Sequence, residues 1–77
     1  MKMKSMANLD IEGRSIQLFP GDSVSKWGVI NHSTVEGIIV YITAVRKGTW
    51  SHAGYNEGQE YFIPWSKLTF TFAEAPE

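Results

Sequence analysis

The aromatic and basic residues around one glycine-rich segment are the best candidates for a functional site. Residues 47–58 hold three glycines and no hydrophobic periodicity, which predicts a long loop. A Trp and a Tyr on such a loop can stack on a base, a sugar or a proline of a partner. Basic residues at the start of the segment add positive charge beside these rings. The candidate binding residues are therefore Arg46, Lys47, Trp50, His52 and Tyr55, together with Trp65, which lies beside Pro64 further along the chain.

Residues suited to catalysis or metal binding are too few and too scattered to predict an enzyme. His32 and His52 form no His-x-His or His-x-x-x-His pair, and cysteine is absent, whereas a zinc site needs about three or four ligands. Ser51, His52 and Asp22 could be written as a triad, but the Gly-x-Ser-x-Gly pattern of a nucleophile elbow is missing. We expect no metal and no cofactor, and a non-catalytic role is favoured over an enzymatic one.

Length and composition favour a single small domain. The chain has 77 residues, of which 13% are aromatic, and this aromatic content could supply most of a small core. The net charge of −1 provides no basic face for duplex nucleic acid. No apolar run approaches the length of about 18 residues that a membrane-spanning helix requires. We therefore expect a soluble, cytoplasmic protein without a membrane partner.

Strand patterns account for most of the chain. Period-two alternation begins at Ser15, and Pro20–Asp22 predicts a turn. A second strand continues to Ile30 with a bulge or a tight bend at Gly28, and residues 31–33 predict a polar turn. The run from Ile38 to Val45 is apolar on both faces, which is typical of a central strand covered on both sides.

The end of the chain predicts two more strands on either side of a break at Pro64. Residues 61–63 form the first, and residues 68–72 form the second, with Leu68, Phe70 and Phe72 on one buried face. No segment has helical spacing over more than a turn or two. We expect a barrel domain over residues 15–72, a flexible N-terminal segment over 1–14 and a loose acidic tail over 73–77.

Two of these segments resemble a known class of barrels. Ile16–Asp22 is similar to the first strand and Gly-Asp turn of Src-homology-3-like barrels, and Tyr61–Leu68 resembles the strand and turn that precede their last strand. Sm-like barrels share this layout. The resemblance covers about three quarters of the chain. It implies an all-β, five-stranded antiparallel open barrel with a short 3-10 turn before the last strand.

The favoured function is a non-catalytic binding or assembly module. Its partner would be a protein or another copy of the chain in a homo-oligomer, held through an exposed aromatic surface. Small size and surplus aromatics also resemble accessory proteins of phages and mobile elements. One alternative is a single-stranded nucleic-acid binder using Arg46, Lys47, Trp50 and Tyr55. The other is a small enzyme whose site forms between subunits.

Overall fold

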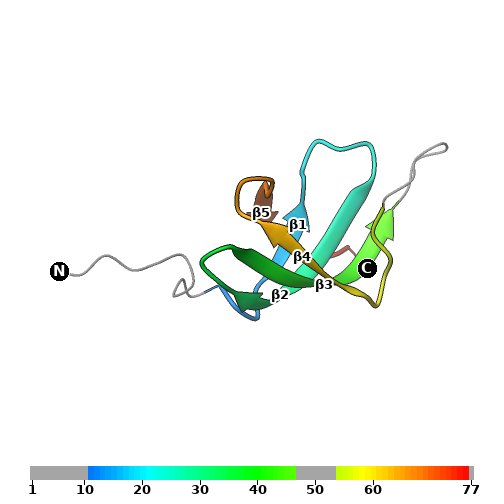
Figure 1. Cartoon of the computed structure of the whole chain (residues 1–77). Coiled ribbons are helices and arrows are strands. Elements are labelled where there is room, and N and C mark those ends of the chain that lie inside the picture. Colours follow the sequence, from blue (N-terminus) through cyan, green and yellow to red (C-terminus); the bar gives the residue numbers. More distant parts are fainter. Residues whose placement is uncertain (1–10, 47–53, 77) are drawn as a thin grey trace.

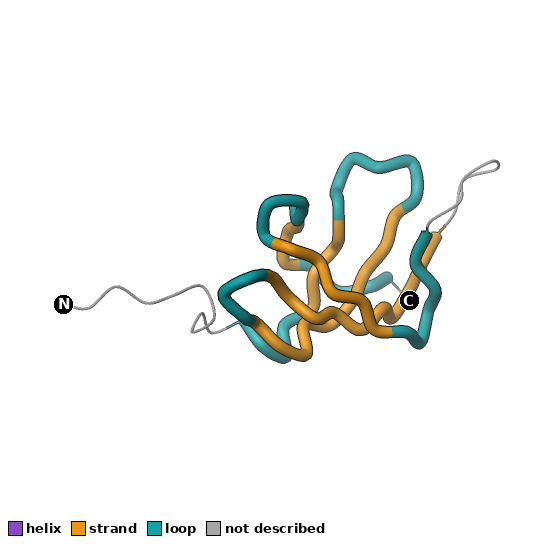
Figure 2. The backbone as a smooth tube through the Cα atoms, in the orientation of Figure 1, coloured by secondary structure: helices purple, strands orange, loops and turns teal. Residues whose placement is uncertain are grey.

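Five antiparallel strands form one open sheet in the computed structural model, which describes residues 11–46 and 54–76 (Figure 1). Along the sheet the order is β4-β3-β2-β1-β5, so β4 and β5 are its two edges. Turns and loops join the strands, and the described residues contain no helix (Figure 2). The predicted all-β, five-stranded open barrel is therefore confirmed. The strands are β1 (Ser15–Leu18), β2 (Ser25–Ser33), β3 (Gly37–Arg46), β4 (Glu60–Pro64) and β5 (Phe70–Phe72).

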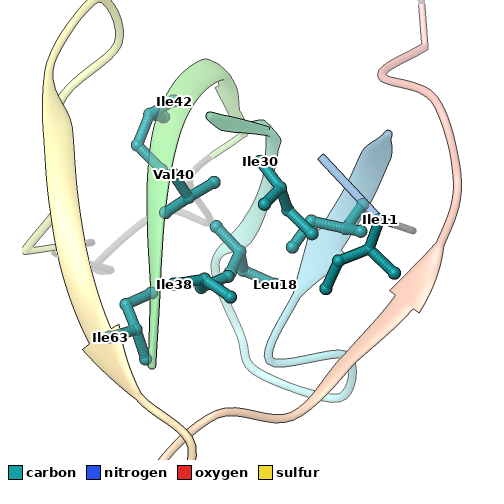
Figure 3. Close-up of a cluster of buried hydrophobic side chains, with 8 residues drawn as sticks. Ile11, Leu18, Ile30, Ile38, Val40, Ile42 and Ile63 are labelled. Atoms are coloured by element: carbon teal, nitrogen blue, oxygen red, sulfur yellow. The ribbon is translucent and has the colours of Figure 1, made fainter. Parts of the chain in front are cut away.

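Branched aliphatic side chains on the concave face of the sheet make up the core (Figure 3). Alternate residues of β3 point inward, so Ile38, Val40 and Ile42 are fully buried. Each such side chain contributes about 1.5–3 kcal/mol on burial. The expectation that aromatic rings would supply most of the core is wrong. The buried cluster consists of Ile11, Ile16, Leu18, Ile30, Ile38, Val40, Ile42 and Ile63.

Strand β2 bends around this core through two irregularities in its pairing with β3. One lies between Trp27 and Gly28, where the sequence predicted a bulge, and the other between Ile30 and His32. A Cβ at Gly28 would lie 2.6 Å from the carbonyl oxygen of Tyr41. Only glycine therefore allows the two strands to approach this closely.

The polar turn predicted at residues 31–33 is wrong, because β2 continues through Ser33. Asn31 and His32 face solvent, so their polarity is compatible with a strand that is buried on one side only. The chain reverses its direction at residues 34–36 instead. There the Thr34 hydroxyl accepts hydrogen bonds from the backbone N–H groups of Glu36 and Gly37 at 3.2 and 3.1 Å.

The connection from β4 to β5 is a hydrogen-bonded turn that begins at Pro64. The N–H of Lys67 donates to the carbonyl of Pro64 at 3.0 Å, and that of Leu68 donates to the carbonyl of Trp65 at 3.3 Å. The structure does not show the expected 3-10 turn, and residues 65–67 are turn residues. The last strand is also shorter than predicted, since pairing with β1 begins only at Phe70.

Residues on both sides of the predicted domain contact the sheet. Ile11 is buried in the core, and the N–H of Gly13 donates to the carbonyl of Ile30 at 2.7 Å. At the other end, the N–H of Ala73 donates to the carbonyl of Ser15 at 3.2 Å. Residues 11–14 thus cover one end of the barrel.

Candidate functional site

The structure describes three of the six predicted site residues. Lys47, Trp50 and His52 lie outside the described residues. Of the others, Arg46 is exposed at the end of β3, while Tyr55 and Trp65 are half-buried. Tyr55 lies with the β1–β2 loop and Trp65 with the β2–β3 turn, at opposite ends of β2 (Figure 1). These two aromatic candidates therefore do not form one site.

Tyr55 belongs to a packed aromatic cluster at one end of the barrel. Its ring centroid is 6.1 Å from that of Phe19 and 4.8 Å from that of Tyr61, which it meets edge-on. The Tyr61 hydroxyl accepts a hydrogen bond from the N–H of Asn56 at 2.8 Å. Burial raises the pKa of the Tyr55 phenol, and the neighbouring Tyr61 and the Asp22 carboxylate raise it further. We define Phe19, Tyr55 and Tyr61 as the loop aromatic cluster.

A buried lysine fastens the β1–β2 loop beneath this cluster. Lys26 is only 2% exposed, and its Nζ donates to Asp22 Oδ2 at 3.0 Å and to the carbonyl of Val24 at 2.9 Å. The Nζ also lies 5.3 Å from the ring centroid of Phe19. A buried ammonium is tolerated only when it is paired in this way. Lys26 therefore has a structural role and is not available to a ligand.

Trp65 is held by the β2–β3 turn. Its indole N–H donates to the carbonyl of Thr34 at 2.8 Å, and its backbone N–H donates to the carbonyl of Glu36 at 3.1 Å. The ring packs against the edge of the core. These contacts fix the orientation of Trp65 and leave it only partly exposed, which is the arrangement of a side chain that closes a barrel end.

Two of the exposed rings lie on paired strands, on the face opposite the core. Tyr41 of β3 is 41% exposed and Phe62 of β4 is 52% exposed. Phe62 pairs with Ile39 and Tyr41 pairs with Val29, so all four side chains share one face of the sheet. We call this surface, made of Val29, Ile39, Tyr41 and Phe62, the outer aromatic face. The interpretation of Ile38–Val45, the central part of β3, as a strand covered on both faces is therefore wrong.

Polar groups and an open strand edge border the outer aromatic face. The side-chain amide of Asn31 on β2 donates a hydrogen bond to the Glu60 carboxylate on β4, across the intervening β3. Among the described strands β4 pairs only with β3, so its other side is an edge that can accept another strand. An apolar centre with a polar border is the usual composition of a protein-binding surface.

The alternation of side chains along β3 was the sequence signal that could have located the outer aromatic face. Ile38, Val40 and Ile42 take the inward positions, and therefore the residues between them must point outward. Phe62 follows because it lies opposite Ile39. What the sequence alone left open was whether another layer covers that face.

No known protein family matches the sequence, and no curated protein or solved structure emerged as a relative. Within residues 11–46 and 54–76, no group of three or more His, Cys, Asp or Glu side chains could hold a metal ion. The same residues include no helix long and apolar enough to cross a membrane.

Proposed function

We propose that the protein is a non-catalytic binding or assembly module that holds a protein partner through the outer aromatic face. The observation that carries this proposal is the exposure of Tyr41 and Phe62 on neighbouring strands at one edge of the sheet. Large rings left in water at adjacent positions gain free energy when a partner covers them. Tyr and Phe are also enriched in the centres of protein interfaces.

The edge strand β4 supports the same proposal. A segment of a partner in extended conformation can add to the open side of β4 through backbone hydrogen bonds. Phe62 then lies where a side chain of the added strand would contact it. The partner can be another protein or a second copy of this chain, which would make a homo-oligomer.

The architecture proposed with this function is that of the Src-homology-3-like and Sm-like barrels. The five-stranded open antiparallel sheet supports it, together with the similarity of Ile16–Asp22 and Tyr61–Leu68 to segments of these barrels. Such folds host many unrelated functions, so this proposal concerns architecture alone.

The test compares partner capture by the immobilised protein and by surface variants in a lysate of the source organism. We expect Phe62→Ser and Tyr41→Ser to lose a protein that the unmodified chain retains, because each removes a ring from the interface centre. Val35→Ser is the matched control, since Val35 is 65% exposed but lies in the β2–β3 turn. The captured protein, once purified, is then titrated against each variant.

Two results would contradict the proposal. One is equal binding of the purified partner by Phe62→Ser, Tyr41→Ser and the unmodified chain. The other is the absence of a captured protein combined with salt-dependent quenching of tryptophan fluorescence by single-stranded oligonucleotides, which would favour the nucleic-acid alternative.

A further inference from the structure

One carboxylate lies beside the exposed rings of the outer aromatic face. Glu60 of β4 is exposed and pairs with Tyr41 of β3, so its side chain leaves the sheet on the same side as the Tyr41 ring. Phe62 comes two residues later on β4 and therefore shares this side. The Tyr41 hydroxyl lies in the other direction along the chain, 3.9 Å from the position that a Cβ on Gly58 would occupy. Glu60 is thus placed between two exposed rings.

Asn31 holds the Glu60 carboxylate over the sheet. Its side-chain amide donates a hydrogen bond from β2 to Oε2 of Glu60, across the intervening β3. This amide supplies one donor, whereas an ionised carboxylate can accept about four hydrogen bonds. Within residues 11–46 and 54–76, no lysine or arginine forms an ion pair with Glu60. The carboxylate is therefore fixed in position but still open to a cation from outside the described part of the chain.

A partner that covers the outer aromatic face must also cover this carboxylate. Removing water from an ionised carboxylate costs free energy unless an opposite charge or new hydrogen bonds replace the water. A wholly apolar partner would leave that cost uncompensated, and an acidic partner would add repulsion. A basic side chain offsets the cost and is also attracted to aromatic rings. A guanidinium fits best, because it can stack on a ring while its N–H groups bind a carboxylate in pairs.

We propose that the partner segment which adds to β4 presents an arginine to Glu60, with the guanidinium between the rings of Tyr41 and Phe62. The inference rests on the proposed function, since it names the chemistry of the partner at the same surface. A strand added along β4 places alternate side chains on the outer side of the sheet. An arginine at the position beside Glu60 then extends over the carboxylate. The occupant is thus a positively charged extended segment of a protein.

Two seven-residue peptides with blocked ends test this inference. One has arginine at its centre and the other has glutamine there, with threonine and valine alternating elsewhere in both. The backbone amide chemical shifts of Ile39, Glu60 and Phe62 report binding to the outer aromatic face. We expect the arginine peptide to bind at least about fivefold more tightly than the glutamine peptide at low salt. Added salt should reduce this difference, because it screens the charge pair.

Glu60→Gln is the decisive variant. Its amide keeps an oxygen that can accept the hydrogen bond from Asn31 and loses only the charge. The two peptides should therefore bind Glu60→Gln with equal affinity. Glu36→Gln is the matched control, since it removes the same charge from the exposed β2–β3 turn and should keep the preference for arginine. Phe62→Ser should weaken the binding of both peptides.

Four results would overturn the inference. The first two are equal affinity of the peptides for the unmodified chain and an unchanged preference for arginine in Glu60→Gln. The others are the absence of any shift with the arginine peptide and shifts of the same amides caused by a single-stranded oligonucleotide. If Phe62→Ser still loses affinity for the purified protein partner, the proposed function stands even when this inference fails, so the two can be distinguished.

Discussion

The loop aromatic cluster and the outer aromatic face use the same kind of side chain in opposite ways. In the cluster, the Tyr55 ring packs against the rings of Phe19 and Tyr61, so these aromatic side chains contact one another within the folded chain. On the outer face, Tyr41 and Phe62 project from paired strands into solvent. Loops can fold back and bury their own rings. A strand cannot, because its alternation forces every second side chain away from the core.

This difference shows why aromatic content alone does not locate a binding surface. A ring on a glycine-rich loop is free to pack against its own protein, as Tyr55 does. A ring on the outward face of an edge strand can be covered only by another secondary-structure element or by a binding partner. The predictions that follow test whether the outer face is a surface for binding and the loop cluster a part of the fold.

The largest effect is expected from Gly37→Ala, which separates the two strands that carry the outer face. An added Cβ would lie 2.7 Å from Pro64 Cα and even closer to the Ile63 carbonyl oxygen. We expect the free energy of unfolding to fall by about 3 kcal/mol or more, since backbone atoms cannot move away without breaking the β3–β4 ladder. Urea unfolding measures this loss. Glu36→Ala at the neighbouring exposed position is the control and should change little.

A second comparison sets the two faces of β3 against each other. Ile42→Ala removes a fully buried side chain and should cost about 3 kcal/mol. Tyr41→Ala, one residue away on the outer face, should cost less than about 1 kcal/mol. The same urea experiment measures both variants. Equal losses would show that the outer face is covered within the folded chain.

The ion pair beneath the loop aromatic cluster should have a moderate effect. Asp22→Ala leaves the Lys26 ammonium buried with the Val24 carbonyl as its remaining hydrogen-bond acceptor, so we expect a loss of about 1–2 kcal/mol. Lys26→Met introduces an apolar side chain of similar length in place of the buried charge. In the Lys26→Met background, Asp22→Ala should therefore cost almost nothing. A double-mutant cycle measured by thermal unfolding checks this, and additive losses would refute the coupling.

The smallest effect concerns the pKa of Tyr55, which burial raises above its usual value. The folded state then holds the phenol proton more tightly than the unfolded state does. This contribution to stability is complete below the unfolded pKa of about 10 and is lost as the pH rises through the folded pKa. Tyr55→Phe should therefore lose less stability above pH ~10 than the unmodified chain. Unfolding curves recorded across that range check the difference.

Much of the fold could be predicted from local patterns, but not what covers each face. The β-branched run over Ile38–Val45 and the alternation around Ile16 located strands correctly, because these patterns depend on neighbours in sequence. Asn31 was misassigned to a turn, since polar residues are equally compatible with the solvent side of a strand. The sequence around Ile11 has no hydrophobic periodicity, and only the tertiary contacts of Ile11 place it in the core.

The candidate site was harder to predict because exposure depends on contacts distant in sequence. Nothing in the segment around Tyr55 shows that Phe19 lies beside it, 36 positions earlier. Phe62 was assigned to a strand, and only the pairing of β4 with β3 shows that its ring lies on the outer aromatic face. Among the described residues, the exposed rings of Tyr41 and Phe62 were therefore not among the predicted site residues, whereas Arg46 was predicted and is exposed.

The most direct test of the central claim is to titrate the purified partner against Phe62→Ser and Tyr55→Phe in parallel. Both variants remove aromatic or phenolic surface, but from the two different regions. We predict that Phe62→Ser weakens binding at least about tenfold, as loss of a central interface ring does, and that Tyr55→Phe binds like the unmodified chain. Loss of affinity in Tyr55→Phe with normal binding by Phe62→Ser would contradict the account.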